Sequence, residues 1–128
     1  MNSKKHRPTE SELEILQILW EKGPATVREV HEIIESNRDI GYTTTLKIMQ
    51  IMTDKGLLQR DTSQRSHLYN PAFKREDIEG DMLNKMIQNL FSGSASRMVI
   101  GALSQKSLTE KEIGEIRDYL NQLQVPEP

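Results

Sequence analysis

The sequence contains no cysteine and few aromatic residues. Its 128 residues include one Trp, three Tyr and two Phe. The absence of cysteine excludes disulfide bonds, thiolate metal sites and cysteine nucleophiles, and the scarcity of aromatics leaves Leu, Ile, Met and Val to build the core. No apolar run approaches the roughly 18 residues that a membrane-spanning helix needs. No apolar stretch of the signal-peptide type follows the basic N-terminus. We therefore expect a cytoplasmic protein with no membrane insertion.

Charge is nearly balanced over the whole chain but unevenly distributed. The chain has 17 Lys and Arg against 19 Asp and Glu, a formal net charge of −2. Residues 1–75 hold 12 basic against 10 acidic residues, whereas residues 76–128 hold 5 against 9. A basic half joined to an acidic half is a recognised indication of a nucleic-acid-binding part. The difference is small, so by itself it leaves the question open.

Residues for enzyme chemistry are few and scattered. The histidines His6, His31 and His67 show no metal-ligand spacing. The seven glycines form no phosphate-binding loop, and no nucleophile has a partner base. We expect His31 to lie on the polar side of its helix, in solvent. The sequence therefore predicts a protein that is not an enzyme and has no cofactor and no metal.

Three short helices are predicted in the first 55 residues. Residues 9–12 and 26–29 have the Thr-x-x-Glu spacing of a capping box, and apolar residues at helical spacing follow each. Gly23-Pro24 ends the first helix, and the second reaches about Ser36. The third runs from about Thr43 to Lys55 and is closed by Gly56 as a C-cap.

After the third helix the apolar period falls towards two. Residues 57–61 and 66–70 each have the pattern of a strand, the polar residues 62–65 form a turn between them, and Pro71 ends the hairpin. This order predicts a mainly α fold with a small β-hairpin, a winged helix-turn-helix over residues 1–72. The alternative is another small α+β domain.

The third helix is the candidate reading helix. At 100° per residue one side carries Thr45, Ile48, Met49 and Met52, which can pack on the first two helices. The opposite side is small, polar and mildly basic, which suits the major groove of DNA. It carries Thr43, Lys47 and Gln50, with Thr44 and Ile51 beside them. The plainer alternative is that these positions are only solvated.

Basic residues also gather on the predicted hairpin. Arg60, Arg65 and His67 lie on or beside its tip, where a wing would run along the DNA backbone. Lys4, Lys5 and Arg7 could supply a mobile arm to phosphates, in salt-dependent contacts. A loop-tip arginine is usually only solvated, so Arg65 is a DNA-binding candidate because of the helix beside it.

Residues 73–128 carry an apolar stripe that they cannot bury alone. We predict a helical dimerisation domain here, because a two-fold dimer matches a palindromic DNA site. The alternative is that these helices fold back on the N-terminal domain. The candidate dimer residues are Ile78, Met82, Met86 and Leu90, spaced by four, with Ile116 and Leu120 from a helix after Ser107.

Several segments together resemble one known family. The first is the run from Thr9 to Trp20, which is followed by residues 23–27. The second is the run from Gly41 to Thr45, which leads into residues 55–58. The others are the end of the hairpin, Tyr69-Asn70-Pro71, and the C-terminal run from Leu108 to Ile113. In this order and spacing, over nearly the whole chain, they resemble the penicillinase repressor family of the BlaI, MecI and CopY type.

The resemblance implies a dimeric repressor that binds dyad-symmetric operators on double-stranded DNA. By position, it places Thr43, Thr44 and Lys47 of the third helix and Arg60 and Arg65 of the wing on the DNA. It also implies a membrane metalloprotease sensor as a partner, whose activation leads to cleavage and release of the repressor.

Two departures from the family pattern matter for the inducing signal. Members that control β-lactamase carry an Asn-Phe cleavage site where this chain has Gly101-Ala102, so cleavage by the same route and a role in resistance are in question. The copper-responsive members carry a C-terminal cysteine motif, which this chain lacks. We therefore do not expect copper sensing.

Two other functions fit the predicted fold. A winged helix can serve as a protein-interaction module that never touches DNA, and the apolar Leu46 and Ile51 near the reading face mildly favour it. The basic hairpin tip and the polar face of the third helix favour the repressor. A repressor that senses a small molecule would need a pocket, which a sequence does not reveal.

Overall fold

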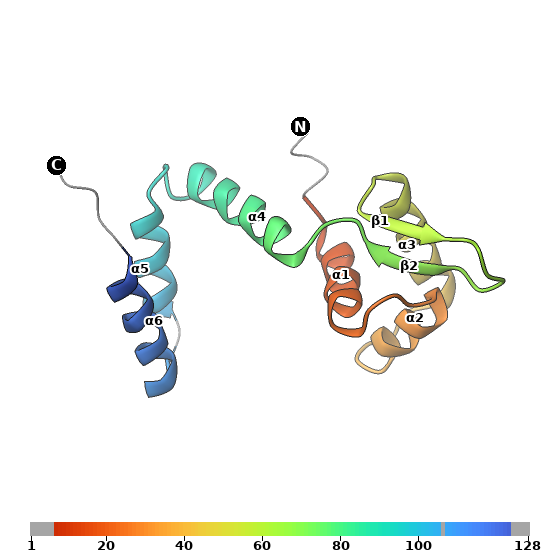
Figure 1. The fold of residues 1–128 in the computed structure, drawn as a ribbon, viewed down its shortest axis with the longest axis horizontal. Helices are drawn as coiled ribbons and strands as arrows, with labels where there is room; N and C mark the ends of the chain where they lie inside the picture. The colour runs from red at the N-terminus through yellow and green to blue at the C-terminus, as the bar shows by residue number, and fades with distance from the viewer. Residues whose placement is uncertain (1–6, 106, 124–128) are drawn as a thin grey trace. The chain divides into compact units, whose positions relative to one another are not determined.

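The computed structural model describes residues 7–105 and 107–123, and within them the chain forms six helices and a two-stranded hairpin (Figure 1). It divides into two compact units, one up to Lys85 and one from Met86 onward. No helix among the described residues is long and apolar enough to span a membrane. The elements are α1 (Glu10–Lys22), α2 (Val27–Glu35), α3 (Tyr42–Asp54), β1 (Leu58–Asp61), β2 (Leu68–Pro71), α4 (Arg75–Asn89), α5 (Ala95–Gln105) and α6 (Glu110–Gln122).

Local capping fixes where α1 and α2 begin. The Thr9 hydroxyl accepts the Glu12 N–H at 3.2 Å, and the Glu12 carboxylate accepts the Thr9 N–H at 2.9 Å. Thr26 and Glu29 make the same pair of bonds, at 3.1 and 2.9 Å. Both predicted capping boxes are therefore confirmed. A third box, Thr109 with Glu112, begins α6 and was not predicted, although its residues have the same spacing.

The core of the first unit lies between α1, α2, α3 and the hairpin. An isolated bridge joins the α1–α2 connection to the second strand: Ala25 N–H donates to Tyr69 O at 3.1 Å, and Tyr69 N–H donates to Ala25 O at 2.8 Å. The fold is that of a winged helix-turn-helix, as predicted. The buried core residues are Ile15, Leu16, Leu19, Ala25, Val27, Val30, Ile34, Met49, Met52, Leu57, Leu58 and Tyr69.

The hairpin differs in detail from its prediction. β1 and β2 pair antiparallel from Leu58↔Pro71 to Asp61↔Leu68, so Pro71 is the last residue of the second strand and does not lie beyond it. Proline is tolerated there because a strand end loses little from a missing N–H. The second strand begins at Leu68, two residues later than predicted, so the tip is longer than predicted. Asp61 starts the tip, its carboxylate accepting the Ser63 N–H at 2.9 Å.

An ion pair between a buried carboxylate and a partly exposed lysine ties the start of α1 to the end of α3. Glu12 is 4% exposed, and Lys55 Nζ lies 2.9 Å from each of its carboxylate oxygens. A buried carboxylate needs such partners, because leaving it unpaired in a low-dielectric core is costly. The pair therefore fixes the C-terminal end of α3 on the scaffold.

The first turns of α4 belong to the first unit. Ile78 is 1% exposed, and Trp20 Nε1–H donates to Phe73 O at 3.0 Å. Arg75 lies over the Trp20 ring at 5.5 Å and pairs with Glu21 at 4.0 Å. The sequence placed the domain boundary at 72/73, ahead of this helix, whereas the two compact units meet within it.

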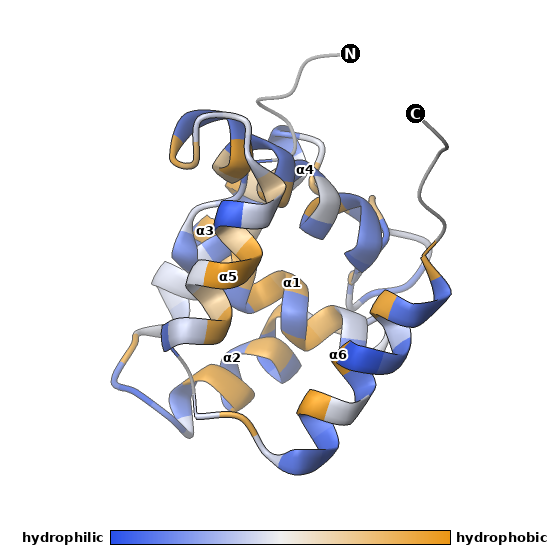
Figure 2. Ribbon diagram, turned by 90° about the vertical axis from the view of Figure 1, so that its left-hand side faces the viewer, coloured by the Kyte–Doolittle hydropathy of each residue, from blue (hydrophilic) through white to orange (hydrophobic). Residues whose placement is uncertain are grey.

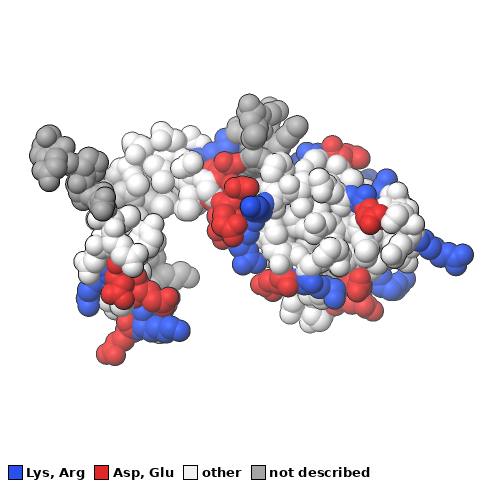
Figure 3. All heavy atoms as spheres, in the orientation of Figure 1, with Lys and Arg blue, Asp and Glu red and all other residues white. Residues whose placement is uncertain are grey.

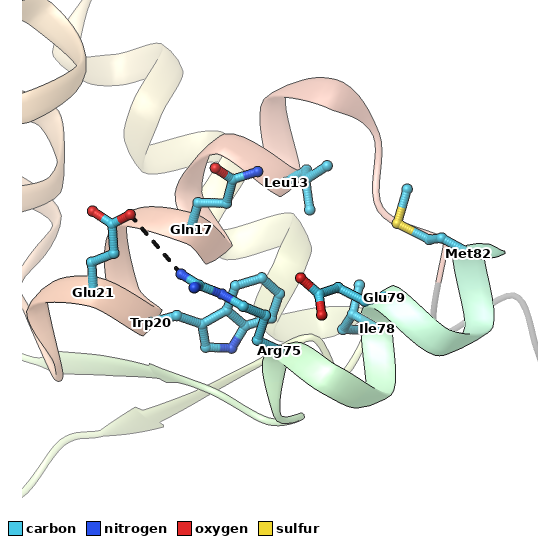
Figure 4. A pocket seen from close by; sticks show the side chains of 8 residues that line it. All are labelled: Leu13, Gln17, Trp20, Glu21, Arg75, Ile78, Glu79 and Met82. Atoms are coloured by element: carbon cyan, nitrogen blue, oxygen red, sulfur yellow. Dashed lines mark ion pairs between the residues drawn. The ribbon is translucent and has the colours of Figure 1, made fainter. Parts of the chain in front are cut away.

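A cleft of about 280 Å³ separates α1 from this part of α4 (Figure 4). Its lining includes both apolar and polar side chains. A repressor that senses a small molecule would need space of this kind, and that alternative remains a prediction. The cleft is lined by Leu13, Trp20, Ile78 and Met82, with Gln17, Glu21, Arg75 and Glu79 around them.

The second unit holds α5 and α6, and neither helix contains a buried residue. Apolar side chains lie along both, and Figure 2 shows α5 mostly in orange and α6 with orange stretches between blue ones. Exposed apolar surface on this scale is unusual for a soluble protein that functions as a monomer. The exposed large apolar residues of the unit are Met86, Leu90, Val99, Ile100, Leu103, Ile113, Tyr119, Leu120 and Leu123.

Candidate nucleic-acid interface

One side of α3 is buried and the opposite side is exposed, as predicted. Thr45, Met49 and Met52 are fully buried against the core, and Ile48 is half-buried. The opposite side is open to solvent, and among the residues that the structure describes, none forms a hydrogen bond or ion pair with its side chains. The side chains on this exposed face, Thr43, Thr44, Lys47 and Gln50, are therefore available to a ligand.

The start of α3 differs from the starts of α1, α2 and α6. Its N-cap residue is Gly41, which makes no side-chain capping bond. The amides of Thr44 and Thr45 bond to Gly41 O at 3.1 and 3.3 Å. The N-terminal turn of a helix carries partial positive charge and free N–H groups. Within the described chain no side chain caps this end, and the first turn holds no acidic residue, so the exposed face of α3 is weakly electropositive at its beginning.

A cleft of about 330 Å³ runs beside the exposed face, between α2, α3 and the hairpin tip. Arg65, Ser66 and His67 line it from the hairpin, and Thr26 and Arg28 line it from the start of α2. On α3 it is lined by Tyr42 and Leu46. These two residues follow Gln50 around the helix at 100° per residue, so the cleft and the exposed face form one continuous surface.

Arg28 and Tyr42 also belong to the candidate interface and were not predicted from the sequence. The Arg28 guanidinium lies over the Tyr42 ring, 5.2 Å from its centroid, so α2 presents a cation to the cleft and α3 presents the aromatic ring that holds it. The available signal was the position of Arg28, in the first turn after the Thr26 cap. Basic residues there are well placed for phosphates, because the first helix of a helix-turn-helix crosses the DNA backbone.

The two predicted wing arginines occupy different places. Arg65 lines the cleft beside α3. Figure 3 shows Lys and Arg side chains projecting at the far right, on the side of the molecule where Figure 1 draws the hairpin. Arg60 is exposed opposite Tyr69 in the register and lines another cleft with Pro24 and Asn70. The structure therefore groups Arg65, but not Arg60, with the start of α3.

The wing also carries one acidic group near its basic ones. The Ser63 N–H bonded to Asp61 holds the pKa of that carboxyl below its ordinary value, and His67 contributes in the same direction. The carboxylate stays ionised at neutral pH and fixes the beginning of the turn. Arg65 follows two residues after this bonded turn, on the exposed part of the tip.

The capping box of α2 gives a pH-dependent prediction. The Thr26 N–H lowers the pKa of Glu29, and Lys22, at 3.7 Å, adds to the effect. A folded-state pKa below the unfolded one means that the stabilisation is full at neutral pH and is lost as the pH falls through the folded-state pKa. In thermal melts, we expect Glu29→Gln to lower Tm at pH 7, and we expect this deficit to shrink as the pH is lowered towards 3. Glu32→Gln removes the same charge outside the box and is the control. An equal Glu29→Gln deficit at both pH values would contradict this role.

His31 is not solvated, contrary to the sequence prediction. It is 6% exposed, and its Nδ1 lies 2.9 Å from the hydroxyl of the fully buried Thr45. The ring also meets Tyr42 edge to face, with centroids 5.4 Å apart. At 100° per residue His31 lies next to Val27 and Ile34, at the edge of the buried side of α2, so its assignment to the polar side was wrong. The start of α3 covers that edge through Tyr42 and Thr45, which the sequence of α2 alone does not reveal.

The predicted dimer residues differ in exposure. Ile78 is buried within the first unit, and Met82 and Ile116 are half-buried. Met86, Leu90 and Leu120 are 45%, 67% and 57% exposed. The last three therefore offer apolar surface to a partner, whereas Ile78 contributes to packing within its own chain. Their role in a dimer stays a prediction.

Comparison with known proteins gives the family. The penicillinase repressor family model matches residues 8–122. The chain is 32% identical over 88 residues to the transcriptional regulator BlaI of Mycobacterium tuberculosis, covering 67% of this chain but 64% of that regulator, just under two thirds of its length.

Two further relatives align over almost their whole length. The methicillin resistance regulatory protein MecI of Mammaliicoccus sciuri is 24% identical over 121 residues, 94% of this chain and 98% of its own. The penicillinase repressor of Staphylococcus aureus is 23% identical over 113 residues, 88% of this chain and 90% of its own. The chain therefore belongs to the penicillinase repressor family, a family of transcriptional repressors and not of enzymes.

Proposed function

We propose that this protein is a dimeric transcriptional repressor that binds dyad-symmetric operator DNA. The observation that carries the proposal is the continuous surface made by the exposed face of α3 and the cleft beside it, which joins Lys47 to Arg28 and Arg65. A helix with short polar side chains can enter the major groove, where Lys and Gln read base edges. The cations of the cleft then lie where the DNA backbone passes.

The second unit supports the dimeric part of the proposal. A two-fold operator is bound by two reading helices, spaced one DNA turn apart, so the protein needs an element that holds two copies together. α5 and α6 contain no buried residue and expose large apolar side chains along their length. Pairing with a second copy would remove this surface from water, which is favourable in proportion to its area.

The structure gives little support for release of the repressor by proteolysis. The bond between Gly101 and Ala102 lies within α5, whereas proteolytic nicking is concentrated at exposed loop tips. Cleavage there would require α5 to open first. We therefore confine the proposal to dimer formation and operator binding, and the membrane sensor protease stays a prediction from the resemblance.

Selection from a random DNA library tests the proposal directly. The full chain is incubated with random-sequence duplexes, and bound DNA is recovered, amplified and sequenced over several rounds. We expect an enriched motif with two inverted half-sites, about one helical turn between their centres. Enrichment of no motif would contradict operator recognition and would favour the protein-interaction module. A motif without dyad symmetry would contradict the dimeric arrangement alone.

Replacing Lys47 and Arg65 by Ala is expected to weaken binding to the selected duplex about ten- to a hundredfold, because each residue contributes a base or phosphate contact. The dependence of log affinity on log salt should flatten by about one for each lost phosphate contact. Fluorescence anisotropy at several salt concentrations measures both quantities.

The matched control for this variant is Lys74→Ala with Lys111→Ala. It removes the same two charges from exposed positions outside the candidate interface. Both double variants should melt at the wild-type temperature, since surface substitutions away from packed or paired groups cost little. If the two variants lose affinity equally, the effect belongs to net charge and the assignment of Lys47 and Arg65 to the interface is wrong.

A further inference from the structure

Two buried polar side chains join α2 to α3, the two helices of the helix-turn-helix. Among the described residues, three polar or charged side chains are buried: Glu12, His31 and Thr45. Glu12 serves the α1 cap and the ion pair with Lys55. The other two bond to each other, His31 Nδ1 to Thr45 Oγ1 at 2.9 Å. Buried polar groups are retained only where their bonds are made, so this pair needs a physical explanation.

The surroundings of His31 fix its ring in one orientation. Its Nε2 lies 3.4 Å from a carboxylate oxygen of Glu35, one turn further along α2. The rings of His31 and Tyr42 meet at an interplanar angle of 81°, and the Arg28 guanidinium lies over the Tyr42 ring. Tyr42 and Thr45 are three residues apart and share one side of α3. His31 therefore holds the first turn of α3 at two points.

α3 has few other directional contacts at its beginning. Its N-cap Gly41 makes no side-chain bond, and its buried apolar anchors are Met49 and Met52, further along the helix. Apolar packing is non-directional, and Met in particular adapts to small shifts of its neighbours. A hydrogen bond weakens steeply when its angle changes. The bond between His31 and Thr45 therefore constrains the rotation of α3 about its own axis in a way that the methionines do not.

We infer that His31 is a positioning residue for DNA recognition, acting through its hydrogen bond to Thr45. By setting the rotation of α3, this bond sets the direction in which Thr43, Lys47 and Gln50 point into the groove. The inference rests on the proposed function and adds a specificity determinant that does not touch DNA. Base contacts require good geometry, whereas phosphate contacts tolerate small shifts, so a misplaced helix loses specific binding before non-specific binding.

The measured quantity is the ratio of affinities for the selected duplex and for a shuffled duplex of the same composition. Thr45→Val keeps the shape of the side chain and removes its hydroxyl. We expect the ratio to fall about fivefold or more, which is the loss of discrimination expected when one base contact is lost. His31→Leu should do the same, and the double variant should show no further loss. Melting curves establish that each variant is folded at the temperature of the binding assay.

Two conservative variants separate positioning from mere packing. The amide of Asn at position 31 can lie where His Nδ1 lies, so His31→Asn keeps a partner for Thr45 and should retain most of the ratio. The amide of Gln lies further out, near Glu35, so His31→Gln should lose the ratio as His31→Leu does. A purely structural histidine would lower both affinities together through fewer folded molecules and would leave their ratio unchanged.

The outcomes distinguish this inference from the proposed function. If the wild type discriminates and Thr45→Val keeps the wild-type ratio within twofold, the positioning role is overturned while the repressor stands. Equal ratios for His31→Asn and His31→Gln would also overturn it, since the bond at Nδ1 would then not matter. A wild type that binds both duplexes equally overturns the proposed function and this inference with it.

Discussion

Replacing Leu90 and Leu120 by glutamate is expected to convert the protein to a monomer and to reduce its affinity for a two-half-site operator at least about a hundredfold. Both side chains are more than half exposed, so glutamate disturbs little within one chain. In an apolar contact between two copies the new charges would be desolvated, which is strongly unfavourable. The loss of affinity follows because linked binding modules gain about 10²- to 10⁴-fold over single ones.

Sedimentation equilibrium gives the oligomeric state, and anisotropy gives the affinities for duplexes with one and two half-sites. Affinity for a single half-site should be unchanged, because the exposed face of α3 is untouched. Gln88→Glu with Gln122→Glu adds the same charges at exposed polar positions of α4 and α6 and should remain dimeric. A Leu90→Glu, Leu120→Glu variant that stays dimeric would contradict the assignment. A wild type that is monomeric at all concentrations would favour helices that fold back on the first unit.

Met49→Ala is expected to lower the free energy of unfolding by about 2–5 kcal/mol, the usual effect of truncating a large, fully buried side chain. Met49 is 0% exposed and belongs to the core cluster of the first unit. The loss combines the transfer free energy of the missing atoms with the cavity that the surrounding helices cannot close. Urea unfolding at a fixed protein concentration measures it, because dimer formation would make the stability depend on concentration.

Ile51→Ala is the matched control for Met49→Ala. It removes a side chain of similar size from the same helix, but at a position that is 42% exposed, so we expect a cost below about 1 kcal/mol. Met49→Leu conserves volume and should cost less than about 1.5 kcal/mol. Equal costs for Met49→Ala and Ile51→Ala would show that α3 is not anchored by the side that the structure buries.

The parts of the fold that were predictable from sequence are those that local chemistry determines. Thr9 and Thr26 each have a glutamate three residues later, and the reciprocal bonds of a capping box need no distant partner. The alternation from Leu57 onward likewise indicates a hairpin without knowledge of its surroundings. The buried side of α3 followed from helical periodicity, and Thr45, Met49 and Met52 are indeed buried.

The features that were not predictable depend on contacts between segments. His31 was expected in solvent from the sequence of its own helix, but the residues that cover it, Tyr42 and Thr45, belong to α3. Arg28 could be assigned to the candidate site only from the structure, in which its guanidinium lies over the Tyr42 ring. Ile78 has the spacing of a dimer residue but is buried within the first unit. Periodicity reports that a position is apolar, but not whether the neighbour that covers it comes from the same chain.

The arrangement of α3 also bears on how such a protein diversifies after gene duplication. The residues that hold the helix in place, Thr45, Met49 and Met52, are buried, whereas Thr43, Thr44, Lys47 and Gln50 are exposed and unbonded within the described chain. Substitutions at exposed positions of this kind usually change stability by less than about 0.5 kcal/mol. If the exposed face of α3 reads the operator as proposed, a duplicated copy can acquire new target genes through a few exposed substitutions without compensating changes in its core.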